Sequence, residues 1–204
     1  MIFGTVFTGQ IKTQGKQYIE TKMFCLIIPI YVVNTLLVTD IVGNGRKGIE
    51  IKTNIHSIIA SIIRIIITII CVFSIGAYIG NYDEMAWLAI PTITSLFLTI
   101  YFWFYFGKTT KYERFARKQF AKEFELYILP SWLKNSTLRF YFESLKKKFT
   151  TKYGKEMNWK EKLLNASKFD EDFSLFYCLT ALESELGDNT ELKKILKDIT
   201  LKNY

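Results

Sequence analysis

Two long runs of apolar residues dominate the pattern of the chain. Residues 55–79 hold one charged side chain, Arg64, and residues 85–106 hold none. Each run is longer than the roughly 20 residues that an α-helix needs to cross the hydrocarbon layer of a bilayer. A core helix of a soluble domain would show a polar face and shorter apolar runs. The pattern therefore predicts two transmembrane helices.

The flanking charges predict how this pair of helices is oriented. Only residues 80–84 separate the two runs, so the helices are expected to form an antiparallel hairpin. The connection carries two acids and no Lys or Arg, whereas Arg46, Lys47 and Lys52 precede the hairpin. Because positive residues concentrate on the cytoplasmic side, we expect both termini in the cytoplasm of a plasma membrane. Arg64 then lies near the cytoplasmic end, where its stem can extend to the headgroups or face the partner helix.

The segment after the hairpin is strongly basic, with six positive residues and one acid between positions 108 and 122. Near an anionic membrane surface each such residue contributes about 1 kcal/mol of binding free energy. Nucleic acid is a weaker alternative, because aromatic residues lie between the basic ones but no nucleic-acid motif accompanies them. The residues expected to contact lipid headgroups are Lys108, Lys111, Arg114, Arg117, Lys118 and Lys122.

Both apolar runs contain a stripe of small polar residues at helical spacing. Such residues let helices approach closely and hydrogen-bond to each other. We expect the stripes to pack the hairpin together, and the alternative is that they line a pore made by several hairpins. The residues of this predicted seam are Ser57, Ser61, Arg64, Thr68, Thr92, Ser95 and Thr99.

Residues 1–54 have the pattern of a small β module. Six of the chain's 11 glycines punctuate short β-prone runs over residues 2–8, 17–22, 24–39 and 49–53. The 17 uncharged residues from Met23 to Thr39 allow a third membrane segment. Pro29, Asn34 and many β-branched residues favour two strands there instead.

The opening of the chain resembles a module found at the start of uncharacterised bacterial proteins. The resemblance rests on residues 1–5 (MIFGT), 21–24 (TKMF) and 26–30 (LIIPI), and it covers about 40 residues. In that module paired cysteines often form a zinc ribbon before the equivalent strand. Here only Cys25 is present, so the resemblance implies a metal-free β module and carries no function.

Residues 108–204 are expected to form a small all-α cytoplasmic domain, with 20 Lys and Arg against 14 Asp and Glu. The periodicity predicts a basic helix over 111–127 that continues from the membrane, and a second helix over 135–153. A short helix around Trp159 and a longer one over 169–186 follow. Asp188 and Glu191 suggest a capping-box-like start for the last helix.

Two apolar stripes of this domain are candidate partner-binding residues. Short helices bury little area, and leftover apolar surface marks interaction sites. The alternative is that the helices cover one another in a closed core. The stripes comprise Phe142, Leu145, Phe149, Phe173, Phe176 and Leu179.

No pattern in the chain indicates catalytic chemistry. There is one histidine, His56, the three cysteines are scattered, and no phosphate loop or nucleophile elbow is present. We expect no metal, no cofactor and no enzymatic activity. Abundant Ile, Lys and Asn are typical of an AT-rich, bacterial genome.

Together these features predict an α+β membrane protein with a two-helix transmembrane hairpin, an N-terminal β module and a C-terminal helical domain. The expected function is that of an accessory subunit or scaffold that binds a larger membrane complex. The alternative is a homo-oligomeric pore or transporter component.

Overall fold

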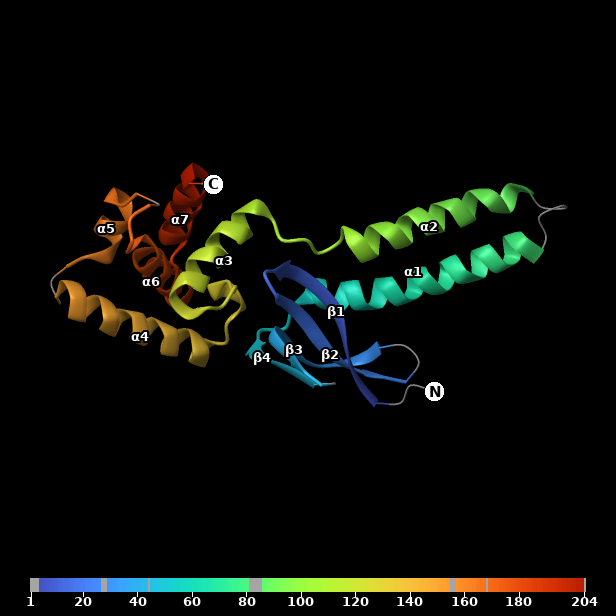
Figure 1. Ribbon diagram of the computed structural model, residues 1–204, viewed down its shortest axis with the longest axis horizontal. Coiled ribbons are helices and arrows are strands. Elements are labelled where there is room, and N and C mark those ends of the chain that lie inside the picture. The colour runs from blue at the N-terminus through green and yellow to red at the C-terminus, as the bar shows by residue number, and fades with distance from the viewer. Residues whose placement is uncertain are drawn as a thin grey trace. The chain divides into compact units, whose positions relative to one another are not determined.

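The computed structural model describes residues 4–26, 29–43, 45–80, 86–154, 157–167 and 169–203 (Figure 1). The chain forms two compact units. The first comprises Met1–Ile49 and Thr53–Lys108, and the second comprises Glu50–Lys52 and Thr109–Tyr204. The expected α+β class is confirmed.

A four-stranded antiparallel sheet forms the N-terminal part of the first unit, in the order β1-β2-β3-β4. Its strands are β1 (Gly4–Gln14), β2 (Gln17–Cys25), β3 (Pro29–Val42) and β4 (Gly45–Ile51). The described part of the 23–39 segment belongs to β2 and β3, apart from a bend at Leu26. The prediction of strands is therefore confirmed there, and the alternative of a third membrane segment is wrong.

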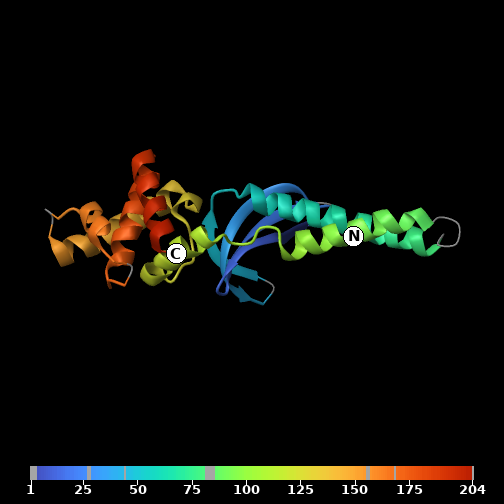
Figure 2. The ribbon, with the colours of Figure 1, turned by 90° about the horizontal axis from the view of Figure 1, so that it is seen from above.

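Two long helices, α1 (Ile55–Gly80) and α2 (Ala89–Phe104), follow the sheet, and a 3₁₀ turn, η1 (Ala86–Leu88), precedes α2. Both helical stretches are long and apolar enough to cross a membrane by length and composition. Only 22% and 6% of the residues in their apolar windows are buried, whereas a soluble protein buries a core helix of this kind. The two helices run alongside each other in both views (Figures 1 and 2). The predicted connection over residues 81–84 lies outside the described residues.

The chain breaks between α2 and the basic helix α3 (Lys111–Phe124), so the expectation of one continuous helix is wrong. Gly107 has φ +77°, a left-handed conformation that ends the helical path. Thr110 then begins a new helix, because its side chain accepts from the amide of Glu113 and the Glu113 side chain accepts from the amide of Thr110. This reciprocal pair is a capping box.

The second unit consists mainly of helices. After α3 come η2 (Pro130–Trp132), α4 (Asn135–Tyr153), α5 (Trp159–Asn165), α6 (Phe173–Leu186) and α7 (Thr190–Asn203). The helices predicted over 135–153 and around Trp159 are confirmed, but α6 begins four residues later than expected. The cap of α7 is also different, since Asn189 Oδ1 accepts from the amides of Glu191 and Leu192. Asp188 instead accepts from Lys193 at 2.7 Å.

An aromatic and aliphatic core holds the helical unit together. Leu145 and Phe149 of α4 and Phe173, Phe176 and Leu179 of α6 are each at most 5% exposed. The Phe149 and Phe176 rings lie 6.0 Å apart. The expectation that these five form an exposed partner surface is therefore wrong, because the helices bury them against one another.

The sixth candidate of that set is only half-buried. The ring of Phe142 lies 6.3 Å from Trp159. The two apolar stripes of α4 and α6 therefore form a closed core, and Phe142 lies at its edge.

Candidate functional site

The polar seam of α1 is covered by the sheet over its first three turns. Ser57 Oγ donates to the carbonyl of Gly9 at 2.7 Å and accepts from Thr21 Oγ1 at 2.8 Å. Ser61 Oγ donates to Thr8 Oγ1 at 3.0 Å. Ser57 and Ser61 are fully buried by these contacts. The expectation that they hold α1 against α2 is wrong, because both hydroxyls bond to the sheet.

Gly9 explains how the helix and the strand come so close. A Cβ at this position would lie 2.1 Å from the carbonyl oxygen of Ser57, and the backbone has φ +73°. Both facts require glycine. Backbone therefore meets backbone where β1 crosses α1, and a larger residue in β1 would separate them.

Arg64 joins three elements of the first unit. Its Nε donates to the carbonyl of Phe102 in α2 at 2.8 Å, and its Nη1 donates to the carbonyl of Gln10 in β1 at 2.8 Å. The guanidinium also lies 5.6 Å from the Trp103 ring. An arginine suits this position because its several donors diverge in a fixed plane. We call Ser57, Ser61 and Arg64 with their bonded partners the Arg64 junction.

The hydroxyls of the remaining seam residues bond mainly within α1 and α2. The hydroxyls of Thr68 and Thr99 donate to carbonyls one turn back in their own helix, those of Arg64 and Ser95. Two contacts cross between α1 and α2. Thr92 Oγ1 lies 3.1 Å from the Ser74 carbonyl, and Trp103 Nε1 donates to Thr68 Oγ1 at 3.2 Å. Together with the bond from Arg64 to Phe102, these contacts link α1 to α2.

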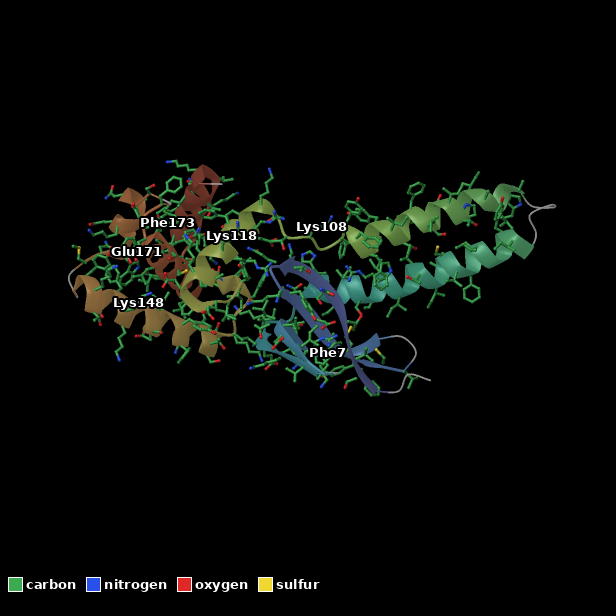
Figure 3. The ribbon with its side chains drawn as sticks, in the orientation of Figure 1. Phe7, Lys108, Lys118, Lys148, Glu171 and Phe173 are labelled. Carbon is green, nitrogen blue, oxygen red and sulfur yellow. The ribbon has the colours of Figure 1, made fainter. Side chains whose placement is uncertain are left out.

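Five of the six predicted headgroup ligands are exposed: Lys108, Lys111, Arg114, Lys118 and Lys122 (Lys108 and Lys118 are labelled in Figure 3). Their exposure is compatible with contact to an anionic surface, which stays a prediction.

Arg117 is the exception, and its assignment to headgroups is wrong. It is completely buried, and its Nε donates to the carbonyl of Tyr127 at 2.7 Å. The guanidinium lies 5.2 Å from the Trp132 ring. Burial lowers the pKa of Arg117 to about 10. Arg117 therefore fixes the chain that follows α3, a role that a count of basic residues does not reveal.

The acidic residues of the helical unit are engaged in contacts between its helices. Glu123 of α3 accepts from Lys148 of α4 at 2.8 Å and from Ser174 of α6 at 2.5 Å. Asp172, just before α6, accepts from Lys152 at 2.7 Å and from the hydroxyl of Tyr153. The hydrogen bonds from Lys152 and Tyr153 hold the pKa of Asp172 below its ordinary value. These groups stabilise the packing of α3, α4 and α6.

The buried thiol of the helical unit is not activated. Cys178 is fully buried, and burial raises the pKa of its thiol well above the ordinary value. A protonated thiol is a poor nucleophile. Across the described ranges, no group of three His, Cys, Asp or Glu side chains could hold a metal ion.

A small, partly open cavity lies among the helices of the second unit. Its volume is about 110 Å³, and Tyr112, Phe120, Tyr177, Glu185 and Lys193 are among the residues that line it. This volume is smaller than the roughly 300 Å³ of a typical small-molecule site. A second and more open cavity, of about 470 Å³, lies beside α4, with Lys146, Phe149 and Trp159 among its lining residues.

Comparisons of the chain with protein-family models, with curated proteins and with solved structures gave no significant match. The function therefore has to be inferred from the contacts described above.

Proposed function

We propose that this chain is an integral membrane protein that acts without catalysis as an accessory subunit or scaffold. In this proposal α1 and α2 span the plasma membrane, both termini lie in the cytoplasm, and the helical unit binds a larger membrane complex.

The observation that carries the membrane part is the distribution of exposed side chains on the hairpin. Phe73 of α1 and Ile90 and Phe97 of α2 are 75%, 71% and 69% exposed. Large apolar side chains at this density are costly in water and favourable in lipid. The buried residues of α1 are all small, apart from the arginine of the junction: Ser57, Ala60, Ser61, Arg64 and Cys71. Small residues allow another element to approach closely, and at Ser57 and Ser61 that element is β1.

The scaffold part is supported by the use that the chain makes of its polar groups. The Arg64 junction consists of hydrogen bonds to backbone carbonyls and hydroxyls, which hold the sheet to the hairpin. Glu123 and Asp172 hold helices together by ion pairs with Lys148 and Lys152. These arrangements stabilise a structure and present no activated nucleophile.

A pore has less support than a subunit. The hydroxyls of Thr94 and Thr99 donate to carbonyls of their own helix at 2.8 Å. A polar path needs groups that face a channel, and ionisable groups at mid-depth mark such paths. Among the described residues of α1 and α2, Arg64 is the only Asp, Glu, Lys or Arg. Its guanidinium donates to two backbone carbonyls.

Native mass spectrometry of the full chain, extracted in a mild detergent from membranes of cells that express it, tests this function. We expect a complex that contains this chain together with at least one different membrane protein in fixed stoichiometry. A symmetric ring of this chain alone would contradict the proposal and favour the pore.

A matched pair of variants makes this experiment specific. Phe140 of α4 is 69% exposed, and Phe149 of the same helix is 1% exposed. Phe140→Ser is expected to leave the helical unit folded, so loss of the partner in that variant would place the binding surface on α4. Retention of the partner by Phe149→Ala despite an unfolded helical unit would contradict binding through this unit.

A further inference from the structure

Charged residues are absent from one end of the N-terminal sheet. Residues 1–11 and 23–39 contain no Asp, Glu, Lys or Arg. The antiparallel register pairs Val6 with Met23 and Phe24 with Tyr31. The start of β1, the end of β2 and the start of β3 therefore meet at the same end of the sheet. We call the described residues 4–7, 23–26 and 31–33 the uncharged end.

Most charged side chains of the sheet lie away from this end, and two cations reach only its edge at Phe7. Lys22 and Arg46 mark the boundary, because the Lys22 Nζ and the Arg46 guanidinium lie 5.7 Å and 5.8 Å from the Phe7 ring. The others follow toward the opposite end or in β4: Lys12, Lys16, Glu20, Asp40, Lys47 and Glu50. Such segregation within one small sheet is not expected if both ends face water.

Large apolar side chains are exposed at the uncharged end. Val6, Leu26, Tyr31 and Val33 are 38%, 41%, 68% and 46% exposed. Strand ends and turns in water normally carry polar residues. A tyrosine beside aliphatic residues is typical of a membrane interface, where the ring is buried and the hydroxyl remains hydrated.

The sheet is fixed to the hairpin in an orientation that brings this end toward the bilayer. Near the other end of β1, the amide of Lys12 donates to the carbonyl of Gly107, just beyond α2, at 2.7 Å. From there β1 leads back to the uncharged end. Figures 1 and 2 show that β1 begins on the side toward which α1 runs, and in Figure 1 the strand lies oblique to the hairpin with its start away from α1.

The length of the free part of α1 supports the same placement. The 16 steps from Arg64 to Gly80 correspond to about 24 Å of helix, whereas the hydrocarbon layer is about 30 Å thick. The layer therefore extends past Arg64 to the turns that β1 covers through Ser57 and Ser61. Part of β1 then lies at the depth of the membrane boundary.

We propose that the uncharged end of the sheet inserts into the same membrane leaflet that α1 enters, with Leu26, Tyr31 and Val33 in contact with lipid. The inference rests on the proposed insertion of the hairpin. Its consequence is a second membrane contact for the first unit, which fixes the sheet against the bilayer surface instead of leaving it free in the cytoplasm.

Depth-dependent fluorescence quenching tests this contact on the full chain. The native cysteines Cys25, Cys71 and Cys178 are buried, so an environment-sensitive dye can be attached under native conditions to one introduced thiol. The variants are Tyr31→Cys at the uncharged end, Ile41→Cys at the opposite end of the sheet and Phe97→Cys in the hairpin. Ile41 is a matched control because it is also apolar and 53% exposed.

Each labelled variant is reconstituted in phosphatidylethanolamine and phosphatidylglycerol vesicles that carry quenchers at a shallow or a deep acyl position. We expect the dye at position 31 to lose at least about twofold more emission to the shallow quencher than the dye at position 41. The dye at position 97 should be quenched from the deep position. Unlabelled wild-type protein checks that the native thiols do not react.

The outcomes separate this inference from the proposed function. Quenching at position 97 with equal, weak quenching at positions 31 and 41 would overturn the inference and leave the membrane hairpin intact. Absence of quenching at position 97 would overturn the proposed function itself. A dye at position 31 that is shielded from water but not quenched by lipid would show that a protein surface covers this end, which also overturns the inference.

Discussion

Helices α1 and α6 are both rich in apolar residues, but α6 buries its large apolar side chains and α1 exposes them. Eleven of the 14 residues of α6 are buried, and Phe173, Phe176 and Leu179 are among them. In α1 only five of 26 residues are buried, and they are small or polar, whereas large side chains such as Phe73 are exposed.

This difference supports the surroundings that we propose for each helix. In the helical unit apolar side chains gain free energy by leaving water, so they collect inside. In the hairpin the apolar side chains face outward, and the polar groups are enclosed by hydrogen bonds to carbonyls and hydroxyls. That is the arrangement expected where the surroundings cannot hydrogen-bond. The four predictions that follow test this contrast, from the largest expected effect to the smallest.

Replacing a phenylalanine by alanine is expected to destabilise the helical unit far more than the hairpin. Phe149→Ala should lower the free energy of unfolding of the helical unit by about 3 to 5 kcal/mol, because it leaves a cavity in a closed core. Phe97→Ala, at a 69% exposed position of α2, removes no such packing. Thermal unfolding of both variants in detergent micelles measures the effect. Equal losses of stability would contradict the contrast.

Gly9→Ala is expected to disrupt the Arg64 junction. The new Cβ would lie 2.1 Å from the Ser57 carbonyl, and overpacking of this kind costs about 1 to 3 kcal/mol or more. We expect faster proteolysis of the sheet while the hairpin remains in the membrane. Gly76→Ala is the matched control, because a Cβ there meets nothing within 4 Å. Equal protease resistance of the two variants would show that α1 and β1 do not touch.

Thr110→Ala removes the capping box that begins α3. Loss of such a cap typically costs about 1 kcal/mol, and the first turn of α3 should exchange its amide hydrogens faster. Thr151→Ala is a control because its hydroxyl is exposed and bonds only back to Lys147 at 2.9 Å. Unchanged exchange in Thr110→Ala would indicate that α2 and α3 form one continuous helix.

Asp172→Asn is expected to have the smallest effect, below about 1 kcal/mol at neutral pH, since its ion pair is partly exposed. The pKa of Asp172 is lowered by Lys152 and Tyr153, so the carboxylate contributes stability above the ordinary Asp pKa and loses it as the pH falls through the lowered value. The difference in stability between wild type and variant should therefore shrink below about pH 4. A difference that is independent of pH would contradict this role.

Local patterns in the sequence predicted much of the fold. The apolar runs over 55–79 and 85–106 match α1 and the stretch from η1 through α2 to within a few residues, and the helix predicted over 135–153 has the bounds of α4. Length and periodicity decide these features within a single segment. The Thr110 and Glu113 signature that separates α2 from α3 was also present in the sequence, and the basic charges beside it obscured the break.

The candidate site could be predicted only in part, because its contacts join distant segments. Helical spacing places Ser57, Ser61 and Arg64 on one face, but it does not reveal that Thr8, Gly9 and Gln10 cover that face. In the same way, a positive charge count groups Arg117 with exposed lysines. Its burial depends on Tyr127 and Trp132, which only the tertiary structure brings near it.

Topology mapping in living cells tests the membrane hairpin most directly. A reporter that is active only outside the cytoplasm and one that fluoresces only inside are fused after residue 53, between residues 81 and 84, and at Tyr204. We expect the external reporter to be active only at 81–84, and the internal reporter to fluoresce at the other two positions. External activity at either end of the chain, or internal fluorescence at 81–84, would contradict a two-helix hairpin with both termini in the cytoplasm.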